Sequence, residues 1–280
     1  MTLKEKIRGN PTLFALMAPP VRAIKSLHPK AIKDSWVKRA CWKRYAVNPI
    51  IEVSQSDIKS RFHAISAKNY WHIYINRNEM DAYIGTALLP GDIVLDIGGH
   101  VGAYTVPVAK YVGPSGHVFV FEPEDEGREA ILRNLQLNQI SNCSVMDLAI
   151  GDRDGVMSFF VRPEKDTHSL FESNSAASPT GQLLRFEKSV RSVDSLVATG
   201  EIPLPQFIKV DVEGAELLAL EGMCNTIKAT RAVYVECHTT LKVDQGLGDP
   251  ISLVTEKLMS LGARQVVQVD EFHVIGYFAQ

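Results

Sequence analysis

From residue 88 onward, short apolar runs typical of buried strands alternate with stretches typical of helices. An apolar run of about four to eight residues between turn residues indicates a buried strand. Strands that alternate with helices predict a mostly parallel sheet with helices on both faces. Hydrophobic residues make up 45% of the chain and charged residues 22%, which excludes collagen, a coiled coil and wholesale disorder.

The expected elements follow from these runs and from the turn residues between them. Strands are predicted at 93–96, 117–121, 144–150, 156–161, 206–210, 232–235, 265–269 and 273–278. Helices are predicted at 103–112, 127–137, 213–223 and 250–261. The last helix has Asp249 as its N-cap and Pro250 in its first turn. Residues 162–182 are polar and rich in Ser, Thr and Pro, which fits a recognition lid and equally a disordered segment.

The first 50 residues carry 11 lysines and arginines and two acidic residues, although the net charge of the whole chain is −2. Prolines divide this region into short pieces, and a helix is expected over 31–46. We therefore expect a basic N-terminal extension at 1–60 and one large domain at 61–280. The charge asymmetry leaves open a peripheral membrane or protein contact through residues 1–50, beside a plain solvated appendage. The overall charge argues against a general nucleic-acid binder.

The cysteines and the hydropathy pattern indicate a soluble cytoplasmic protein. The cysteines are scattered and form no CxxC pair, which argues against a disulfide framework or a zinc ribbon. No apolar run has the length of about 18 residues that a membrane span needs. The apolar run at 13–18 is too short for a signal peptide and is stopped by two prolines.

Four predicted strands end in an acidic residue or are followed directly by one: Asp96, Glu122, Asp211 and Glu236. Ligands of parallel α/β sheets bind outside the carboxyl ends of the strands, near the point where the strand order reverses. These acids are therefore expected to surround a ligand site.

A glycine-rich turn, Gly98, Gly99 and Gly102, follows the first predicted strand and opens a helix. Glycines let a ligand approach the backbone, and the helix N-terminus offers free N–H groups. A dinucleotide would place its pyrophosphate here, which a carboxylate at Asp96 would repel. The same carboxylate would attract the α-ammonium group of S-adenosylmethionine. Taken by itself, Asp96 could equally be a residue that caps the following helix. Glu122 at the end of the next strand suits ribose hydroxyls, and the two acids together favour a nucleoside site.

Three segments resemble the motifs of one family. Residues 94–105 (VLDIGGHVGAYT) resemble the first motif of class I S-adenosylmethionine-dependent methyltransferases, and residues 119–123 (FVFEP) resemble the second. Residues 207–216 (FIKVDVEGAE) resemble the signature of the FkbM-type family within this class. The resemblance covers roughly residues 80–260. It departs from the family at Gly99 and His100, where Ala-Asn is usual, and this weakens any role for His100.

The resemblance implies a Rossmann-like seven-stranded sheet with an antiparallel last strand, and makes 61–280 a methyltransferase domain. It implies that Asp96 and Gly98 hold the methionine end of S-adenosylmethionine, that Glu122 holds the ribose, and that Asp147 and Ala149 lie near the adenine. Asp147 is read equally well as an acid on a solvent-exposed edge. The full set of expected cofactor-binding residues is Asp96, Gly98, Gly99, Gly102, Tyr104, Glu122, Pro123, Asp147 and Ala149.

The expected catalytic residues follow the two strands of the signature region: Lys209, Asp211, Glu213, Glu236 and His238. Strand alternation places Lys209 and Asp211 on one side, and Glu213 would follow them if the chain stayed extended. A buried lysine needs an anionic partner, so Lys209 is also read as a structural ion-pair partner. His238 or Asp211 could take a proton from an acceptor hydroxyl, or the cluster could hold a divalent ion. No metal is predicted, because no spacing in the sequence demands one.

These observations predict an enzyme that methylates a hydroxyl of a sugar, a glycan or another small-molecule natural product. Two alternatives are weighed beside it. A nicotinamide oxidoreductase is disfavoured by Asp96. A non-catalytic nucleoside-binding module, tethered to a partner or membrane through its basic N-terminal region, is disfavoured by the retained Asp211 and Glu213.

Overall fold

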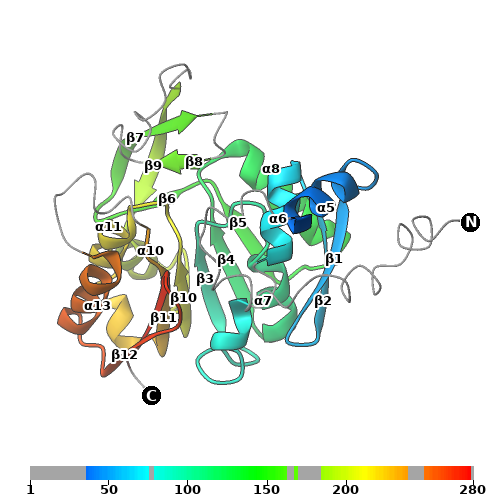
Figure 1. Cartoon of the computed structure of the whole chain (residues 1–280). Helices are drawn as coiled ribbons and strands as arrows, with labels where there is room; N and C mark the ends of the chain where they lie inside the picture. The colour runs from blue at the N-terminus through cyan, green and yellow to red at the C-terminus, as the bar shows by residue number, and fades with distance from the viewer. Residues whose placement is uncertain (1–35, 76–78, 163–166, 170–183, 239–248, 279–280) are drawn as a thin grey trace, which may run out of the picture.

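The computed structural model describes residues 36–75, 79–162, 167–169, 184–238 and 249–278. Its centre is a seven-stranded sheet with helices on both faces (Figure 1). In sheet order the strands are β12 (Gln265–Gln268), β13 (His273–Tyr277), β11 (Ala232–Glu236), β10 (Phe207–Val210), β3 (Ile93–Ile97), β4 (His117–Phe121) and β5 (Cys143–Met146). The strands from β11 to β5 are parallel, whereas β13 is antiparallel to both of its neighbours. The expected α/β fold with an antiparallel last strand is confirmed.

Each face of the sheet packs into its own hydrophobic core, because successive residues of a strand point to opposite faces. Val94 and Leu95 are neighbours in β3, yet they belong to different cores. The core around Val94 lies against α5 (Trp36–Tyr45), α6 (Ala67–Ile75), α7 (Thr105–Val112) and α8 (Asp125–Leu137). The core around Leu95 lies against α10 (Val193–Ala198), α11 (Glu216–Glu221) and α13 (Pro250–Ser260). The two cores fix β3 and β10 rigidly, so the side chains at their carboxyl ends are held in place.

A β-hairpin that the sequence reading did not predict precedes the main sheet. It consists of β1 (Ile50–Gln55) and β2 (Ile58–His63), joined at Ser56 and Asp57, which both have positive φ. Asn134 of α8 and the C-cap residue Asn138 fix it to the domain: Asn134 Oδ1 accepts a hydrogen bond from His63 N (2.7 Å), and Asn138 Oδ1 accepts one from Arg61 N (3.0 Å). The boundary expected between residues 60 and 61 therefore falls inside a strand that is bonded to the main domain.

The strand predicted at 144–150 is wrong in one respect, because it is two strands in different sheets. β5 ends the main sheet, whereas β6 (Ala149–Ile150) pairs with β9 (Leu184–Arg191) in a second sheet. That sheet has the order β6, β9, β7 (Gly155–Arg162) and β8 (Thr167–Ser169). The apolar run at 144–150 does not reveal where the chain leaves one sheet and enters the other. Asp147 and Leu148, which lie between β5 and β6, make that passage. Most of the loop expected at 162–182 lies outside the described residues.

The helix predicted at 213–223 is shorter than expected. Glu213 and Gly214 have φ values of 51° and 107°, and the helix α11 begins only at Glu216. A left-handed residue cannot continue a right-handed helix, so the chain turns sharply before α11 begins. The expectation that Glu213 would extend the strand beyond Asp211 is also corrected by this turn.

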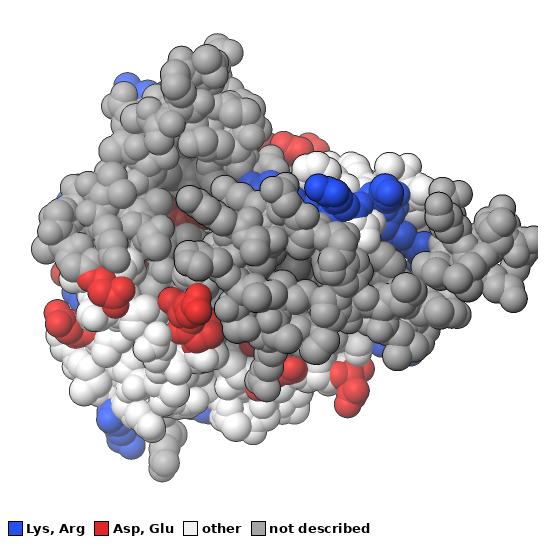
Figure 2. Space-filling view, viewed as in Figure 1, with Lys and Arg blue, Asp and Glu red and all other residues white. Residues whose placement is uncertain are grey.

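The basic character of the N-terminal region is visible on α5, where Lys38, Arg39, Lys43 and Arg44 occur without an acidic residue. Figure 2 shows blue side chains gathered over this part of the molecule. Residues 1–35 lie outside the described part, so a membrane or protein contact through residues 1–50 stays a prediction. Among the described residues, no helix has the length and apolar character needed to cross a membrane.

Candidate active site

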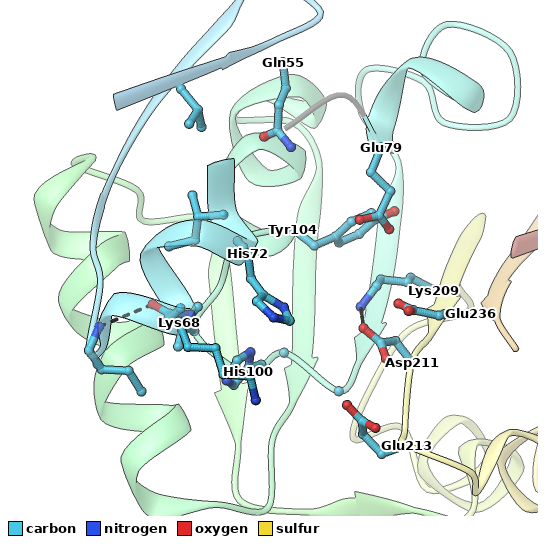
Figure 3. A pocket seen from close by; sticks show the side chains of 18 of the residues that line it. Gln55, Lys68, His72, Glu79, His100, Tyr104, Lys209, Asp211, Glu213 and Glu236 are labelled. Carbon is cyan, nitrogen blue, oxygen red and sulfur yellow. Dashed lines mark hydrogen bonds and ion pairs between the residues drawn. The ribbon is translucent and has the colours of Figure 1, made fainter. Parts of the chain in front are cut away.

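Two cavities meet at the carboxyl ends of β3 and β10. The larger cavity has a volume of about 220 Å³ and the smaller one about 140 Å³. Both are lined by the same four residues, Gly98, His100, Asp211 and Glu213. Figure 3 shows the larger cavity, with Asp211 and Glu213 on one side of it. Three of the four strand-end acids, Glu122, Asp211 and Glu236, line these two cavities together with the first glycine of the turn.

The glycine turn keeps the chain close to β10. Gly98 has a φ of 91°, and a Cβ atom there would overlap the backbone carbonyl of Asp211. A Cβ atom at Gly99 would overlap the side chain of Val120. Gly98 and Gly99 line the larger cavity, whereas Gly102 lines neither cavity and lies beside Ile131. The first two glycines shape the wall of the site, and Gly102 allows close packing of the following segment.

Asp96 is not among the residues that line the two cavities, so the contact of its carboxylate with the cofactor stays a prediction. The residue is fully buried, and its Oδ2 atom accepts a hydrogen bond from Thr105 Oγ1 (2.5 Å). Its Oδ1 atom lies 3.6 Å from Lys209 Nζ. Burial raises the pKa of Asp96, and Lys209 opposes that shift. The carboxylate therefore supports the lysine beneath the site, because β3 and β10 are adjacent and place the two residues in register.

Lys209 links this buried carboxylate to the cavity. Its Nζ atom donates a hydrogen bond to Asp211 Oδ2 (2.9 Å) and lies 5.1 Å from the centre of the Tyr104 ring. Burial alone lowers the pKa of Lys209, but Asp211 and Asp96 outweigh it and raise that pKa above its ordinary value. Burial raises the pKa of Asp211, yet Lys209 and His238 together hold it at about 2. Lys209 is therefore a charged residue that orients Asp211, as the structural reading of the sequence anticipated.

His238 is oriented by a buried acid. Its Nδ1 atom lies 2.7 Å from Oε1 of Glu216, whose side chain is inaccessible to solvent. Its Nε2 atom faces Asp211, Glu213 and Glu236, with carboxylate oxygens at 3.7, 3.6 and 3.8 Å. Burial lowers the pKa of His238, but the hydrogen bond to Glu216 and the other carboxylates raise it to about 10. The ring is then an imidazolium at neutral pH, so His238 is a poor candidate for the base.

Among the described residues of the larger cavity, Glu213 is one of two acids, with Glu79, whose pKa matches a base at neutral pH. Glu213 lines both cavities, and its side chain is 45% exposed. Partial burial raises the pKa of Glu213 to about 7, Asp211 and Glu236 add to the shift, and His238 opposes it. Its left-handed φ of 51° is uncommon for a residue other than glycine and is the kind of backbone strain found at functional sites. The turn before α11 thus presents a carboxylate that titrates near neutrality.

The smaller cavity combines one acid with apolar walls. Glu122 accepts hydrogen bonds from His100 N at Oε2 (2.7 Å) and from Glu124 N at Oε1 (2.9 Å), so its carboxylate is fixed. The expected cofactor residues Pro123 and Ala149 also line this cavity. Asp147 does not line it, because its side chain is exposed and forms an ion pair with Arg128 (2.6 Å). The reading of Asp147 as an acid on a solvent-exposed edge is the one that agrees with the structure.

The residues of the larger cavity that were not anticipated include Gln55, Lys68, His72 and Glu79. Gln55 continues the alternating burial of Ile51 and Val53 along β1, a pattern that is legible in the sequence. Lys68 and His72 are four residues apart on α6, which places them on one helix face. Burial raises the pKa of Glu79 to about 7 against the pull of Lys209. No motif signals this acid, since its place depends on how the segment before β3 folds over the sheet.

Residues 96–270, more than half of the chain, match the family described as the methyltransferase FkbM domain. The chain belongs to this family. It is an S-adenosylmethionine-dependent methyltransferase, with S-adenosylmethionine as its cofactor. The match includes the glycine turn, Glu122 and the segment from Lys209 to His238. The larger cavity also draws on residues that precede the match, such as Lys68.

Two named relatives and one solved structure are similar to this FkbM-type methyltransferase over more than half of its length. The hexuronic acid methyltransferase AglP of Haloferax volcanii is 28% identical over 227 residues, which cover 79% of this chain and 86% of the relative. The 31-O-demethyl-FK506 methyltransferase FkbM of Streptomyces tacrolimicus is 26% identical over 197 residues, or 61% of this chain and 73% of the relative. A solved methyltransferase FkbM from Methylobacillus flagellatus KT is 15% identical with a TM-score of 0.45, covering 89% of this chain and 60% of that structure.

The cluster of Asp211, Glu236 and His238 has the spacing of a metal site, because one ligand atom of each lies within 4.8 Å of the others. Two cations already balance these acids: Lys209 contacts Asp211, and the imidazolium of His238 faces both carboxylates. We therefore expect methyl transfer to be unchanged after treatment with EDTA and gel filtration, measured as S-adenosylhomocysteine formed. Loss of activity that Mg²⁺ or Mn²⁺ restores would instead identify the cluster as a metal site.

Proposed function

We propose that this methyltransferase acts on a hydroxyl of a sugar, a glycan or another hydroxylated small molecule. The observation that carries the proposal is the junction of the two cavities, where Asp211 and Glu213 line both. A nucleoside in the smaller cavity and an acceptor in the larger one would meet at these carboxylates. A hydroxyl acceptor, unlike an already nucleophilic amine, gains from a base at that point.

The smaller cavity fits the nucleoside end of S-adenosylmethionine. Glu122 is fixed by two backbone N–H groups, and each carboxylate oxygen keeps acceptor capacity for a ribose hydroxyl. Phe121, Ile150 and Phe159 supply apolar walls that suit an adenine ring. Among the described residues that line this cavity, none is a lysine or an arginine that would recognise a phosphate. The residues present therefore fit a phosphate-free nucleoside better than a dinucleotide.

The bound cofactor supplies a methyl group on a positively charged sulfur, so the leaving group needs no further activation. The protein then contributes mainly by holding the acceptor oxygen in line with the methyl group. Glu213 accepts the hydroxyl proton, since its pKa near 7 leaves much of it ionised at neutral pH. Asp211 and His238 are charged neighbours of Glu213 and hold the local charges in a fixed arrangement.

The larger cavity supports a polar acceptor. Its lining includes acids, imidazoles and amides, and these groups can bond to several hydroxyls at once. The names of two relatives agree with this chemistry, because one refers to a hexuronic acid and the other to a 31-O position. The test is S-adenosylhomocysteine formation with a panel of methyl glycosides. Absence of turnover on every hydroxylated acceptor, with cofactor binding intact, would favour a non-catalytic nucleoside-binding module instead.

A change at Glu122 tests the placement of the cofactor. We expect Glu122→Gln to weaken S-adenosylhomocysteine binding by about tenfold to a hundredfold, because hydrogen bonds to a charged group are worth about 1.5–3 kcal/mol. Isothermal titration calorimetry measures the dissociation constant directly. Glu129→Gln, the same change at an exposed position on α8, is the control and should bind like the unmodified protein. Equal affinity in all three proteins would remove Glu122 from the binding site.

A further inference from the structure

The two sides of the larger cavity carry different ionisable side chains. Figure 3 shows Lys68, His72 and His100 on one side and Asp211, Glu213 and Glu236 on the other. The acidic side also holds Lys209 and His238, and it belongs to the proposed chemistry. The basic side comes mainly from α6, which precedes the residues that match the family. This side of the cavity has no part in the proposed removal of a proton, so its contribution is to the binding of the acceptor.

Gln55 gives a second, independent sign that a ligand occupies this side. Its side chain extends from β1 toward the cavity, and the residue is only 5% exposed. Its Oε1 atom is buried without a hydrogen-bond partner. A buried amide oxygen without a partner is costly, and native proteins rarely leave one unless a ligand or water completes it. The atom is therefore suited to accept a hydrogen bond from a hydroxyl of a bound molecule.

Lys68 and His72 reach the cavity together because they are four residues apart on α6. The helix is held firmly on the domain: Ile73 and Tyr74 are buried in the core, and Asn69 Oδ1 accepts a hydrogen bond from Ile65 N (3.3 Å). Lys68 and His72 are thus presented by a fixed element. Because Lys68 and His72 line the same cavity as Gln55, the ammonium, the imidazole and the amide can together bind a carboxylate with a neighbouring hydroxyl.

We infer that Gln55, Lys68 and His72 form an acceptor subsite for a carboxylate, so that the acceptor is a hydroxylated carboxylic acid such as a uronic acid. The inference rests on the proposed function, since it describes the acceptor of that same site. The acceptor lies with its carboxylate toward α6 and its reacting hydroxyl toward Glu213. The acids at the far side repel the carboxylate, and this leaves one favourable orientation in the cavity.

Matched glycosides test this subsite. Methyl glucuronoside and methyl glucoside differ at one carbon, which bears a carboxylate in the first and a CH₂OH group in the second. We expect the protein saturated with S-adenosylhomocysteine to bind the glucuronoside more tightly, measured by isothermal titration calorimetry. Lys68→Met should weaken glucuronoside binding on the order of tenfold and leave glucoside binding unchanged, because a charged hydrogen bond is lost. Gln55→Glu should also weaken glucuronoside binding, because the added carboxylate repels the carboxylate of the ligand.

Three controls separate the outcomes. Lys68→Arg keeps the charge and should retain the preference, and Lys228→Met removes a lysine from an exposed position on the 3-10 helix Thr226–Ala229 and should change nothing. The cofactor also carries a carboxylate, so S-adenosylhomocysteine affinity is measured for each variant. A loss of that affinity in Lys68→Met, with the glucuronoside preference retained, would assign Lys68 to the methionine carboxylate and overturn the acceptor subsite.

The inference and the proposed function fail in different ways. Equal binding of the two glycosides, or an equal effect of Lys68→Met on both, would overturn the carboxylate subsite and leave sugar methylation standing. Failure of both glycosides to bind, together with absence of turnover across the whole panel, would overturn the proposed function and the subsite with it. Turnover restricted to acceptors without a carboxylate would overturn the subsite alone.

Discussion

Replacing Glu213 by glutamine is expected to lower kcat by about a hundredfold to ten-thousandfold, which is the usual contribution of a general base. The change keeps the size and the hydrogen-bonding capacity of the side chain but removes its ability to take a proton. The affinity for S-adenosylhomocysteine should be nearly unchanged. Steady-state kinetics with a responsive methyl glycoside, together with calorimetry, separates these two effects.

The pH profile gives a sharper signature of the same role. The base is active in its ionised form, and the pKa of Glu213 lies near 7. In the unmodified protein kcat should therefore rise as the pH increases through about 7 and then level off. This limb should be absent from Glu213→Gln. Glu271→Gln, a change at an exposed acid, is the matched control. If Glu213→Gln and the unmodified protein show the same rise in kcat near pH 7, the titrating group is a residue other than Glu213.

Lys209→Met is expected to lower the free energy of unfolding by about 3–5 kcal/mol, the usual cost of removing one partner of a buried ion pair. Lys209 is 3% exposed and Asp96 is fully buried, so solvent cannot replace the lost ammonium. Asp211 also loses its hydrogen-bond donor. Urea denaturation followed by circular dichroism measures the effect through the shift in midpoint.

Two further variants make this result interpretable. Lys228→Met removes an exposed lysine and should change stability by no more than about 0.5 kcal/mol. The double variant Asp96→Asn with Lys209→Met removes both charges of the buried pair and should recover part of the loss. A loss below about 1 kcal/mol in Lys209→Met would show that the lysine is not needed to balance the buried carboxylate.

Most strands of the sheet and the acids at their ends could be predicted because both depend on local sequence, and the antiparallel last strand was implied by the family resemblance. A buried parallel strand is a short apolar run, and the residue that follows it faces the ligand edge of the sheet. The orientation of a side chain at such an end depends on its neighbours. Asp96 was expected to face the ligand, and its carboxylate is bonded to Thr105 and lies beside Lys209.

Other features were hidden because they depend on long-range contacts. The division of 144–150 into β5 and β6 arises from pairing with β9, which lies about forty residues further along the chain. The turn at Glu213 was read as helix because acids are common in a first helical turn. Gln55 lay in the predicted extension at 1–60, whereas Lys68 and His72 lay in the predicted domain but before its first predicted strand. Their shared cavity depends on the docking of β1 and α6 against the domain.

The hairpin β1–β2 and α6 carry a consequence for how such enzymes diversify. They line the side of the larger cavity opposite Asp211 and Glu213, and they precede the segment that matches the family. Substitutions in β1, β2 or α6 can change which acceptor is bound without changing the residues proposed for catalysis. Exchange of this amino-terminal portion between homologues is therefore a route to new methylated products from a constant donor-binding scaffold.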